Sequence, residues 1–182
     1  ALALGGFSLE ISENYKLKKP LVIYNNFSNS LKETIVNYKN SIIVNEKSEL
    51  NLINYINNSS KENFMVNIIE NIKIKENSSL KNILINNSKC NGYFYKYAKS
   101  DLDKNSNFEN YLISSGLKFN KLDMEINLNE EYSKSSVFSA LNLVKNEHQE
   151  IKTRINHSAP NCHSYQKVKN VLNNESKGVY QG

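Results

Sequence analysis

A unit of about 30 residues recurs along this chain, and the repeat constrains the fold more than any other feature of the sequence. Each copy has an aliphatic residue, a spacer, Glu, a short polar stretch and Leu. The clear copies are Ile11-Ser12-Glu13-Asn14-Tyr15-Lys16-Leu17, Val44-Asn45-Glu46-Lys47-Ser48-Glu49-Leu50 and Ile74-Lys75-Glu76-Asn77-Ser78-Ser79-Leu80. A degenerate relative begins at Leu128, and successive copies start 33, 30 and 54 residues apart, the last offset being twice 27. The chain is therefore expected to stack several copies of one supersecondary unit.

Apolar residues alternate with polar ones on both sides of each polar stretch, which is typical of strands with one buried face. One strand-turn-strand unit cannot bury its apolar face alone, whereas stacked units form a continuous core. We therefore expect an all-β chain, a β-solenoid with coils of roughly 30 residues. The alternative is an antiparallel sandwich or barrel, whose turns are richer in Gly and Pro than the six Gly and two Pro found here. Segments 31–38 and 137–144 fit either a strand or a helix.

Composition excludes several classes of protein. The 182 residues carry 23 Lys and Arg against 18 Asp and Glu, a net charge of +5 that is spread along the chain, and no apolar run is long enough for a membrane helix. We expect one domain, no membrane and no nucleic-acid partner. Cys90 and Cys162 share no spacing pattern, so we expect no disulfide framework and a reducing compartment. The abundant Asn is interpreted as compositional bias without a mechanistic role.

All three histidines lie near the end of the chain, where His157, Cys162 and His163 are the candidate metal ligands and His148 lies nearby. A zinc or iron site needs three or four converging ligands, and structural sites usually contain a Cys-x-x-Cys pair, which is absent here. Cys162 and His163 would point to opposite faces of a strand unless Pro160-Asn161 forms a turn beside them. We therefore expect no metal site made by this chain alone.

Catalytic motifs are also missing. A Cys-His nucleophile pair needs a base in reach of the sulfur and a third group that orients the base, and the neighbours of Cys162 do not provide them. The carboxylates are scattered through polar turns, so no glycosidase pair is identified, and there is no Gly-rich phosphate loop. In the aromatic run 93–97, we expect Tyr93, Tyr95 and Tyr97 on the outer face of a strand and Phe94 on its buried face, rather than a base-stacking site. No catalytic or cofactor-binding residue is predicted.

The C-terminal third resembles a known family. It contains His148 with Glu150 two residues on, Thr153-Arg154-Ile155-Asn156-His157, Pro160-Asn161-Cys162-His163-Ser164-Tyr165-Gln166, then Lys169-Asn170-Val171-Leu172 and Lys177-Gly178-Val179-Tyr180-Gln181-Gly182. In this order and spacing, the segment is similar to the SufB/SufD family of iron–sulfur cluster assembly proteins, and is closer to SufD. Ile151, Lys152, Tyr165, Val168 and Asn170 depart from the family pattern. The opening residues 6–11 and the repeated turns extend the resemblance over nearly the whole chain.

The resemblance implies a right-handed parallel β-helix, with residues 1–182 as its core and with both flanking segments missing. It implies a non-catalytic scaffold subunit that pairs with a SufB-like solenoid and a SufC-like ABC ATPase and supplies apo iron–sulfur proteins indirectly. No intrinsic cofactor is expected, although the complex would hold a transient iron–sulfur cluster. The compartment would be the bacterial cytoplasm or the plastid stroma. The family's cluster-assembly residues lie outside the matching positions, so no functional residue is carried over, and His157 and Cys162 are taken as structural.

A second function class is compatible with the same fold. Extracellular β-solenoids include polysaccharide-acting enzymes and adhesins, and the fold alone does not determine the function.

Overall fold

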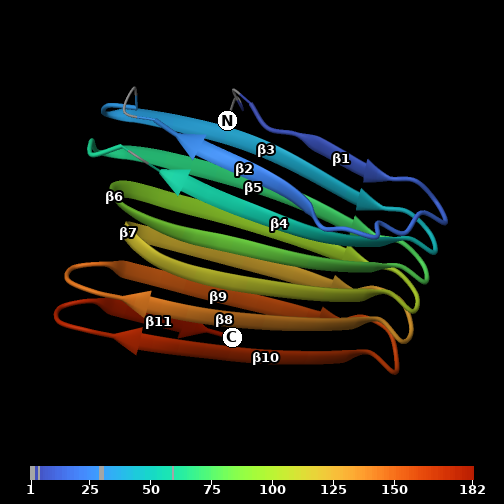
Figure 1. The fold of residues 1–182 in the computed structure, drawn as a ribbon. Helices are drawn as coiled ribbons and strands as arrows, with labels where there is room; N and C mark the ends of the chain where they lie inside the picture. Colours follow the sequence, from blue (N-terminus) through green and yellow to red (C-terminus); the bar gives the residue numbers. More distant parts are fainter. Residues whose placement is uncertain (1–2, 4, 29–30, 59) are drawn as a thin grey trace.

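The structure is a computed structural model that describes residue 3 and residues 5–28, 31–58 and 60–182, without the side chains of residues 58 and 88–90. Its regular secondary structure in these residues consists of strands only. The strands pair in parallel and wind into a β-solenoid of about six turns with a spacing of about 29 residues (Figure 1). The predicted β-helix with coils of roughly 30 residues is confirmed.

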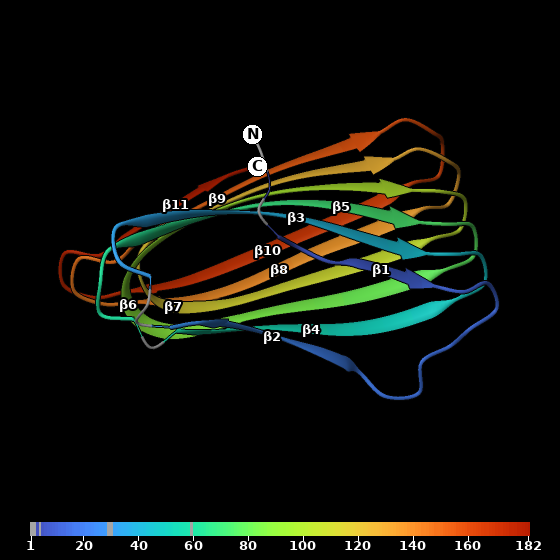
Figure 2. The ribbon, with the colours of Figure 1, turned by 90° about the horizontal axis from the view of Figure 1, so that it is seen from above.

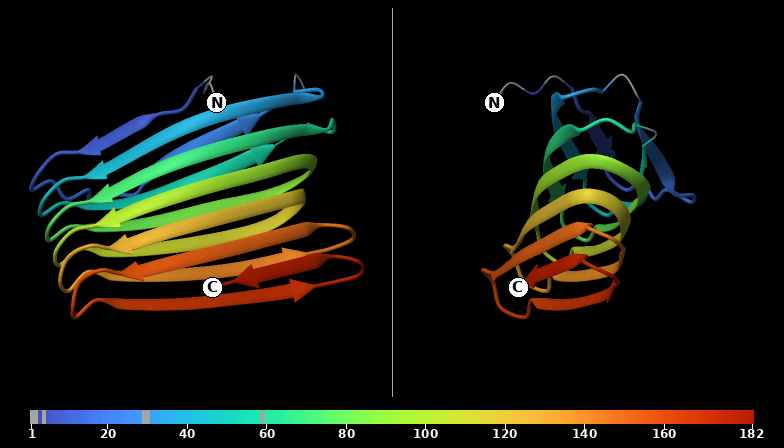
Figure 3. Two further views of the ribbon diagram at one scale, coloured as in Figure 1. Left: turned by 180° about the vertical axis from the view of Figure 1, so that it is seen from behind. Right: turned by 90° about the vertical axis from the view of Figure 1, so that its left-hand side faces the viewer.

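Each coil contributes one strand to each of two faces (Figure 2). The first, which we call the A face, contains β2 (Leu21–Phe27), β4 (Glu49–Asn58), the first parts of β6 (Ser79–Leu102) and β7 (Asn107–Leu128), β8 (Lys134–Leu143) and β10 (His163–Leu172). The second, the B face, contains β1 (Ser8–Ile11), β3 (Thr34–Val44), β5 (Phe64–Ile74), the second parts of β6 and β7, β9 (His148–His157) and β11 (Lys177–Gln181). Figure 3 shows the coils stacked in sequence order from the N-terminal to the C-terminal strands.

The two segments that fit either a helix or a strand lie mainly in strands, since residues 34–38 belong to β3 and residues 137–143 to β8. Their short apolar runs belong to the period-two alternation of the solenoid, because every second residue of β8 from Ser135 to Leu143 is buried. Tertiary stacking therefore decides a choice that the local pattern leaves open.

The register of the strands explains the sequence repeat. Ile11 pairs with Val44, and Val44 with Ile74, at the predicted offsets of 33 and 30. The offset of 54 between Ile74 and Leu128 spans two coils, because Leu102 lies between them and pairs with both. Residues 102–108 are thus a further copy of the unit that the sequence pattern did not reveal.

Inward aliphatic side chains from both faces form one core along the solenoid, including Ile42, Leu52, Ile72, Leu102 and Leu128, each at most 1% exposed. Each such side chain stabilises the fold by about 1.5–3 kcal/mol through burial. The polar turn after the B-face strand repeats as a column of left-handed residues, namely Asn14, Lys47, Asn77, Asn105, Tyr132 and Asn161. Asn tolerates this conformation better than most residues, which is how a chain with few glycines makes these turns.

Asparagine also stabilises the stack through side-chain ladders, which corrects its interpretation as compositional bias alone. In the core, the Asn54 side-chain amide donates to Asn82 and that of Asn82 to Asn110, both at 3.0 Å. Outside, Asn67 donates to Asn37 at 2.9 Å and Asn156 to Asn127 at 2.7 Å. Each amide both donates and accepts, so it can bond to the coil above and the coil below.

Candidate functional site

The candidate ligands lie around the turn between β9 and β10. A turn forms at Pro160-Asn161, which the sequence left open, with Asn161 at a φ of 59°. His157 ends β9 and its Nε2 lies 3.0 Å from the Ser164 hydroxyl, while His163 begins β10 and is exposed. The Cys162 thiol is free and half-buried, 3.2 Å from the Ser133 hydroxyl and 3.3 Å from the Glu130 carbonyl oxygen.

These side chains are near in sequence but do not form a metal centre. Within the described part of the chain, no group of three or more His, Cys, Asp or Glu side chains is placed to hold a metal ion. His148 lies elsewhere, on the outer B face, with its Nε2 3.2 Å from Glu150 and its ring 5.2 Å from that of Phe119. The side chain of Cys90 is outside the described residues, so the expectation about disulfides stays a prediction.

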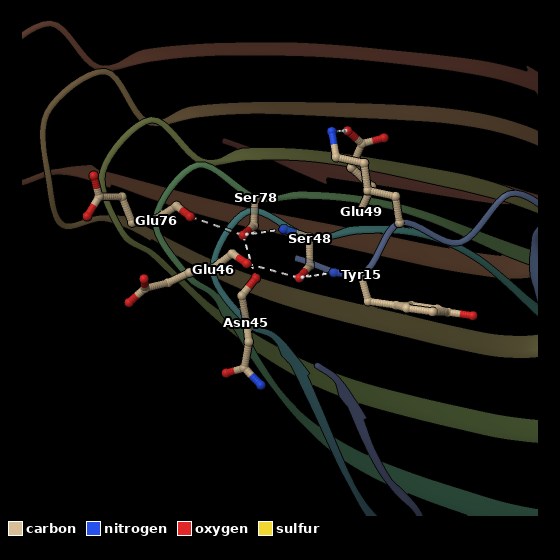
Figure 4. Close-up of polar contacts among 8 residues, drawn as sticks. Tyr15, Asn45, Glu46, Ser48, Glu49, Glu76 and Ser78 are labelled. Atoms are coloured by element: carbon tan, nitrogen blue, oxygen red, sulfur yellow. Dashed lines mark hydrogen bonds and ion pairs between the residues drawn. The ribbon is translucent and has the colours of Figure 1, made fainter. Parts of the chain in front are cut away.

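Cys162 occupies the last position of a serine column at the solenoid's polar turns. The column consists of Ser48, Ser78, Ser106, Ser133 and Cys162, one residue per coil, and its four serines are at most 2% exposed. The Ser78 hydroxyl donates to the Asn45 carbonyl at 2.6 Å and accepts from the Ser48 N–H at 3.2 Å (Figure 4). The Ser48 hydroxyl in turn accepts from the Tyr15 N–H at 3.3 Å.

The hydroxyls of Ser48 and Ser78 each lie within hydrogen-bond distance of a carbonyl in their own turn and of one in the neighbouring coil. Ser106 and Ser133 donate to carbonyls of their own turns, Asp103 at 2.6 Å and Glu130 at 2.8 Å. The Cys162 sulfur approaches the same carbonyl with the longer distance expected of a thiol. Its geometry is therefore that of a serine-like turn residue.

A second polar site lies inside the solenoid and was missed by the sequence analysis. Lys96, an inward residue of β6, reaches Glu70 of β5, and its Nζ lies 2.6 Å from the Glu70 Oε1. The side chains are 12% and 2% exposed, so this is a buried ion pair. A small cavity lies beside the pair, lined also by Asn82, Asn110 and Met124.

The surroundings of this pair are polar as well. The Asn110 side-chain amide lies 3.3 Å from the Met124 sulfur across the core. Desolvation of the two charges offsets most of their attraction. The ion pair joins β5 to β6 and the amide ladder joins β4, β6 and β7, and the two opposite charges leave the interior neutral at this point.

The aromatic run lies as predicted, with Phe94 3% exposed in the core and Tyr93, Tyr95 and Tyr97 half-buried on the outer B face. The Tyr95 hydroxyl donates to Asp123 at 3.0 Å, and the Tyr97 hydroxyl to Glu125 at 3.1 Å. Burial, followed by the hydrogen bond to the neighbouring carboxylate and its charge, raises the pKa of both phenols.

The outer A face carries a related group. The Tyr111 hydroxyl donates to Glu109 at 2.9 Å, and Lys81 lies 3.3 Å from the same carboxylate. Burial raises the pKa of Glu109, but the hydrogen bonds from Tyr111 and Lys81 and the charge of Lys81 outweigh it and hold the pKa below its usual value. The Lys81–Glu109 ion pair links β6 to β7 in neighbouring coils, whereas the Tyr111–Glu109 hydrogen bond lies within β7.

Residues of the family-like motif also have structural positions. The Thr153 hydroxyl hydrogen-bonds Gln166 and lies 3.1 Å from the Tyr180 hydroxyl. Tyr180 donates to Gln166 at 2.6 Å. The three side chains come from β9, β10 and β11, so this contact joins the two faces inside the last coils.

Comparison with known proteins agrees with this architecture. None of the described residues forms a helix suited to crossing a membrane. No curated protein matches the sequence. Residues 26–182, most of the chain, match the family model described as "SUF system FeS cluster assembly, SufBD core domain". With its stacked parallel coils and a match of this extent, the chain belongs to the SufBD core-domain family of the SUF system of iron–sulfur cluster assembly.

Proposed function

We propose that this chain is the β-helical core of a SufD-like scaffold subunit, which pairs with a SufB-like solenoid and a SufC-like ABC ATPase. The observation that carries the proposal is the family match over residues 26–182. The SufD assignment rests on the spacing of the C-terminal motif from His148 to Gly182. In this role the iron–sulfur cluster is cargo that the complex builds and passes to apo-proteins.

The geometry of the motif residues supports a scaffold rather than a catalyst. Thr153, Gln166 and Tyr180 bond to one another between coils, and Cys162 closes a turn in the serine column. These roles hold coils together, and a rigid stack of parallel strands offers its edge backbone groups to the strands of a second solenoid. The proposed compartment is the bacterial cytoplasm or the plastid stroma, where a free thiol such as Cys162 stays reduced.

The test is anaerobic co-purification of the tagged full-length protein from its own cells, with identification of the bound proteins and assay of iron and sulfide. We expect an ABC-type ATPase and a second solenoid subunit to be recovered together with iron. Recovery of neither protein would contradict the scaffold role.

A matched variant separates structural from chemical roles of the cysteine. Cys162→Ser restores the residue that the other four coils use, so the complex and its iron content are expected to remain unchanged. Loss of iron with the complex intact would assign the Cys162 thiol to the cluster and contradict its structural role.

A further inference from the structure

The outer surface of the A face carries an apolar stripe that is not part of the core. It consists of two columns of outward side chains over five coils. We call it the outer apolar stripe, and its members are Val22, Ile53, Ile83, Tyr111 and Phe138 in one column and Tyr24, Tyr55, Ile85, Ile113 and Ala140 in the other. Each column follows the register of the parallel strands, so its members lie directly above one another.

Four of these ten side chains, Val22, Tyr24, Ile113 and Ala140, are exposed, and the other six are half-buried. Tyr24 is 66% exposed, Ile113 49% and Val22 41%. Neighbouring side chains in a column contact one another, as Tyr111 and Phe138 do through stacked rings with centroids 4.8 Å apart. Such contacts cover the sides of the residues that face neighbouring coils and leave the outward surface open.

The B face differs at the equivalent outward positions. In the two columns through Tyr95 and Tyr97, the next coils carry Lys121 and Asp123, followed by Glu150 and Lys152. Charged residues are the usual outward residues of a solvated sheet. The B face has one apolar outward column, which consists of Ile35, Met65, Tyr93 and Phe119 and continues as His148, whereas the A face has two such columns side by side. Contiguous apolar patches of this kind often mark interaction sites.

Charges bound the stripe at one end. In β10 the two columns continue as Lys167 and Lys169, which pair in register with Phe138 and Ala140 and are exposed. Along one side, Lys81 is neutralised by Glu109 at 3.3 Å. Along the other side lie neutral amides and hydroxyls, such as the Ser115–Asn87 pair at 2.9 Å. The end over β10 is therefore positively charged.

The size of the stripe restricts what can cover it. Five strands about 4.8 Å apart and two columns about 7 Å apart define a surface of about 24 by 14 Å, or about 330 Å². Any partner that covers this surface alone buries about 650 Å² in total, below the 1,200 Å² at the lower end for specific interfaces, so the outline of the stripe and not its area restricts the partner. An α-helix is about 10 Å wide and needs about 16 residues to span 24 Å. The long, narrow outline therefore fits one helix.

We propose that the outer apolar stripe binds one amphipathic α-helix of a partner protein, about 16 residues long, with acidic residues at the end that lies over β10. The apolar side of the helix, spaced i, i+3, i+4 and i+7, covers the two columns. The acidic end meets Lys167 and Lys169, and a helix C-terminus there adds the negative end of its dipole. This proposal goes beyond the scaffold role and does not depend on it.

The test is site-specific photo-cross-linking in the full-length protein in its own cells. A benzophenone amino acid replaces Ile113 in the stripe or, as the matched control, Ile69, an isoleucine on the outer B face that is 45% exposed. We expect position 113 to cross-link a peptide of another protein with the amphipathic spacing and an acidic end, and position 69 not to do so. Cross-links to a second copy, to the same chain, to a non-helical peptide, or equally from both positions would overturn the proposal, as would none.

A charge variant tests the orientation independently. Lys167→Glu together with Lys169→Glu is expected to lower the cross-link yield at position 113 by about fivefold, since each surface charge contact contributes up to about 1 kcal/mol. Lys152→Glu on the B face is the control and is expected to leave the yield unchanged. An unchanged yield in the double variant would overturn the acidic end over β10.

Discussion

Replacing Lys96 by Met should destabilise the solenoid strongly, because it leaves the Glu70 carboxylate buried without its counter-charge. The Lys96 Nζ lies 2.6 Å from Glu70, and the two side chains are 12% and 2% exposed. Breaking a buried pair from one side costs about 3–5 kcal/mol. With an m-value of about 2 kcal/mol per molar urea, the unfolding midpoint should fall by about 1.5–2.5 M. Far-UV circular dichroism during urea titration at pH 7 measures this shift.

The double variant Glu70→Leu/Lys96→Met removes both charges and should recover most of the loss, to within about 1 kcal/mol of the original protein. Lys121→Met is the matched control, because Lys121 pairs with Glu150 at 3.3 Å but both side chains are at least 30% exposed. That variant should cost less than about 1 kcal/mol. A loss below 1 kcal/mol for Lys96→Met, or a double variant as unstable as the single one, would refute the reasoning.

Four further substitutions test the turns, the core and the outer ladders. Ser78→Ala removes the buried acceptor of the Ser48 N–H and should lower the unfolding free energy by about 1–3 kcal/mol. Ser135→Ala is the control and should lower it little, because the buried Ser135 hydroxyl has no partner among the described residues. Urea unfolding of both variants measures the difference. Lys47→Gly should raise stability by up to about 1 kcal/mol, since Lys47 has a φ of 57°, and a lower thermal midpoint would contradict it. The pKa of the Tyr95 phenol is raised in the folded state, so the stabilisation it contributes is present below about pH 10 and is lost as the pH rises through the folded pKa. In Tyr95→Phe, the unfolding free energy should therefore fall less steeply above about pH 10, and an unchanged fall would contradict this.

The coils can be predicted from the sequence because two features repeat with the same period, namely the alternation of apolar residues and the polar turn. The sequence analysis missed the copy at 102–108, where Lys104 replaces the turn Glu and Phe108 replaces the final Leu. That copy nevertheless forms the same turn, since Asn105 has a left-handed φ of 54° and the Ser106 hydroxyl donates to the Asp103 carbonyl at 2.6 Å. A search for the left-handed Asn and the following Ser, rather than for Glu and Leu, would have found it.

The candidate metal ligands were predicted from clustering in the sequence, which is a weak guide in a solenoid. Residues close in space are there separated by one coil, as Cys162 and Ser133 are by 29 positions. Adjacent residues of one strand instead point to opposite faces. The useful comparison for Cys162 is therefore with the residue one coil earlier, and that residue is a turn serine.

The buried ion pair follows from the same rule, and a signal for it was present in the sequence. In β5, Glu70 stands in phase with the inward residues Val66 and Ile72, so the alternation that predicts the strand also places a carboxylate in the core. In β6, Lys96 stands in the inward phase between Phe94 and Ala98. A buried charge needs an opposite charge within reach, so two inward residues of opposite charge that lie one coil apart are expected to form an ion pair. In β-solenoids, a charged residue in the inward phase should therefore be matched against the neighbouring coils before it is treated as a break in the strand.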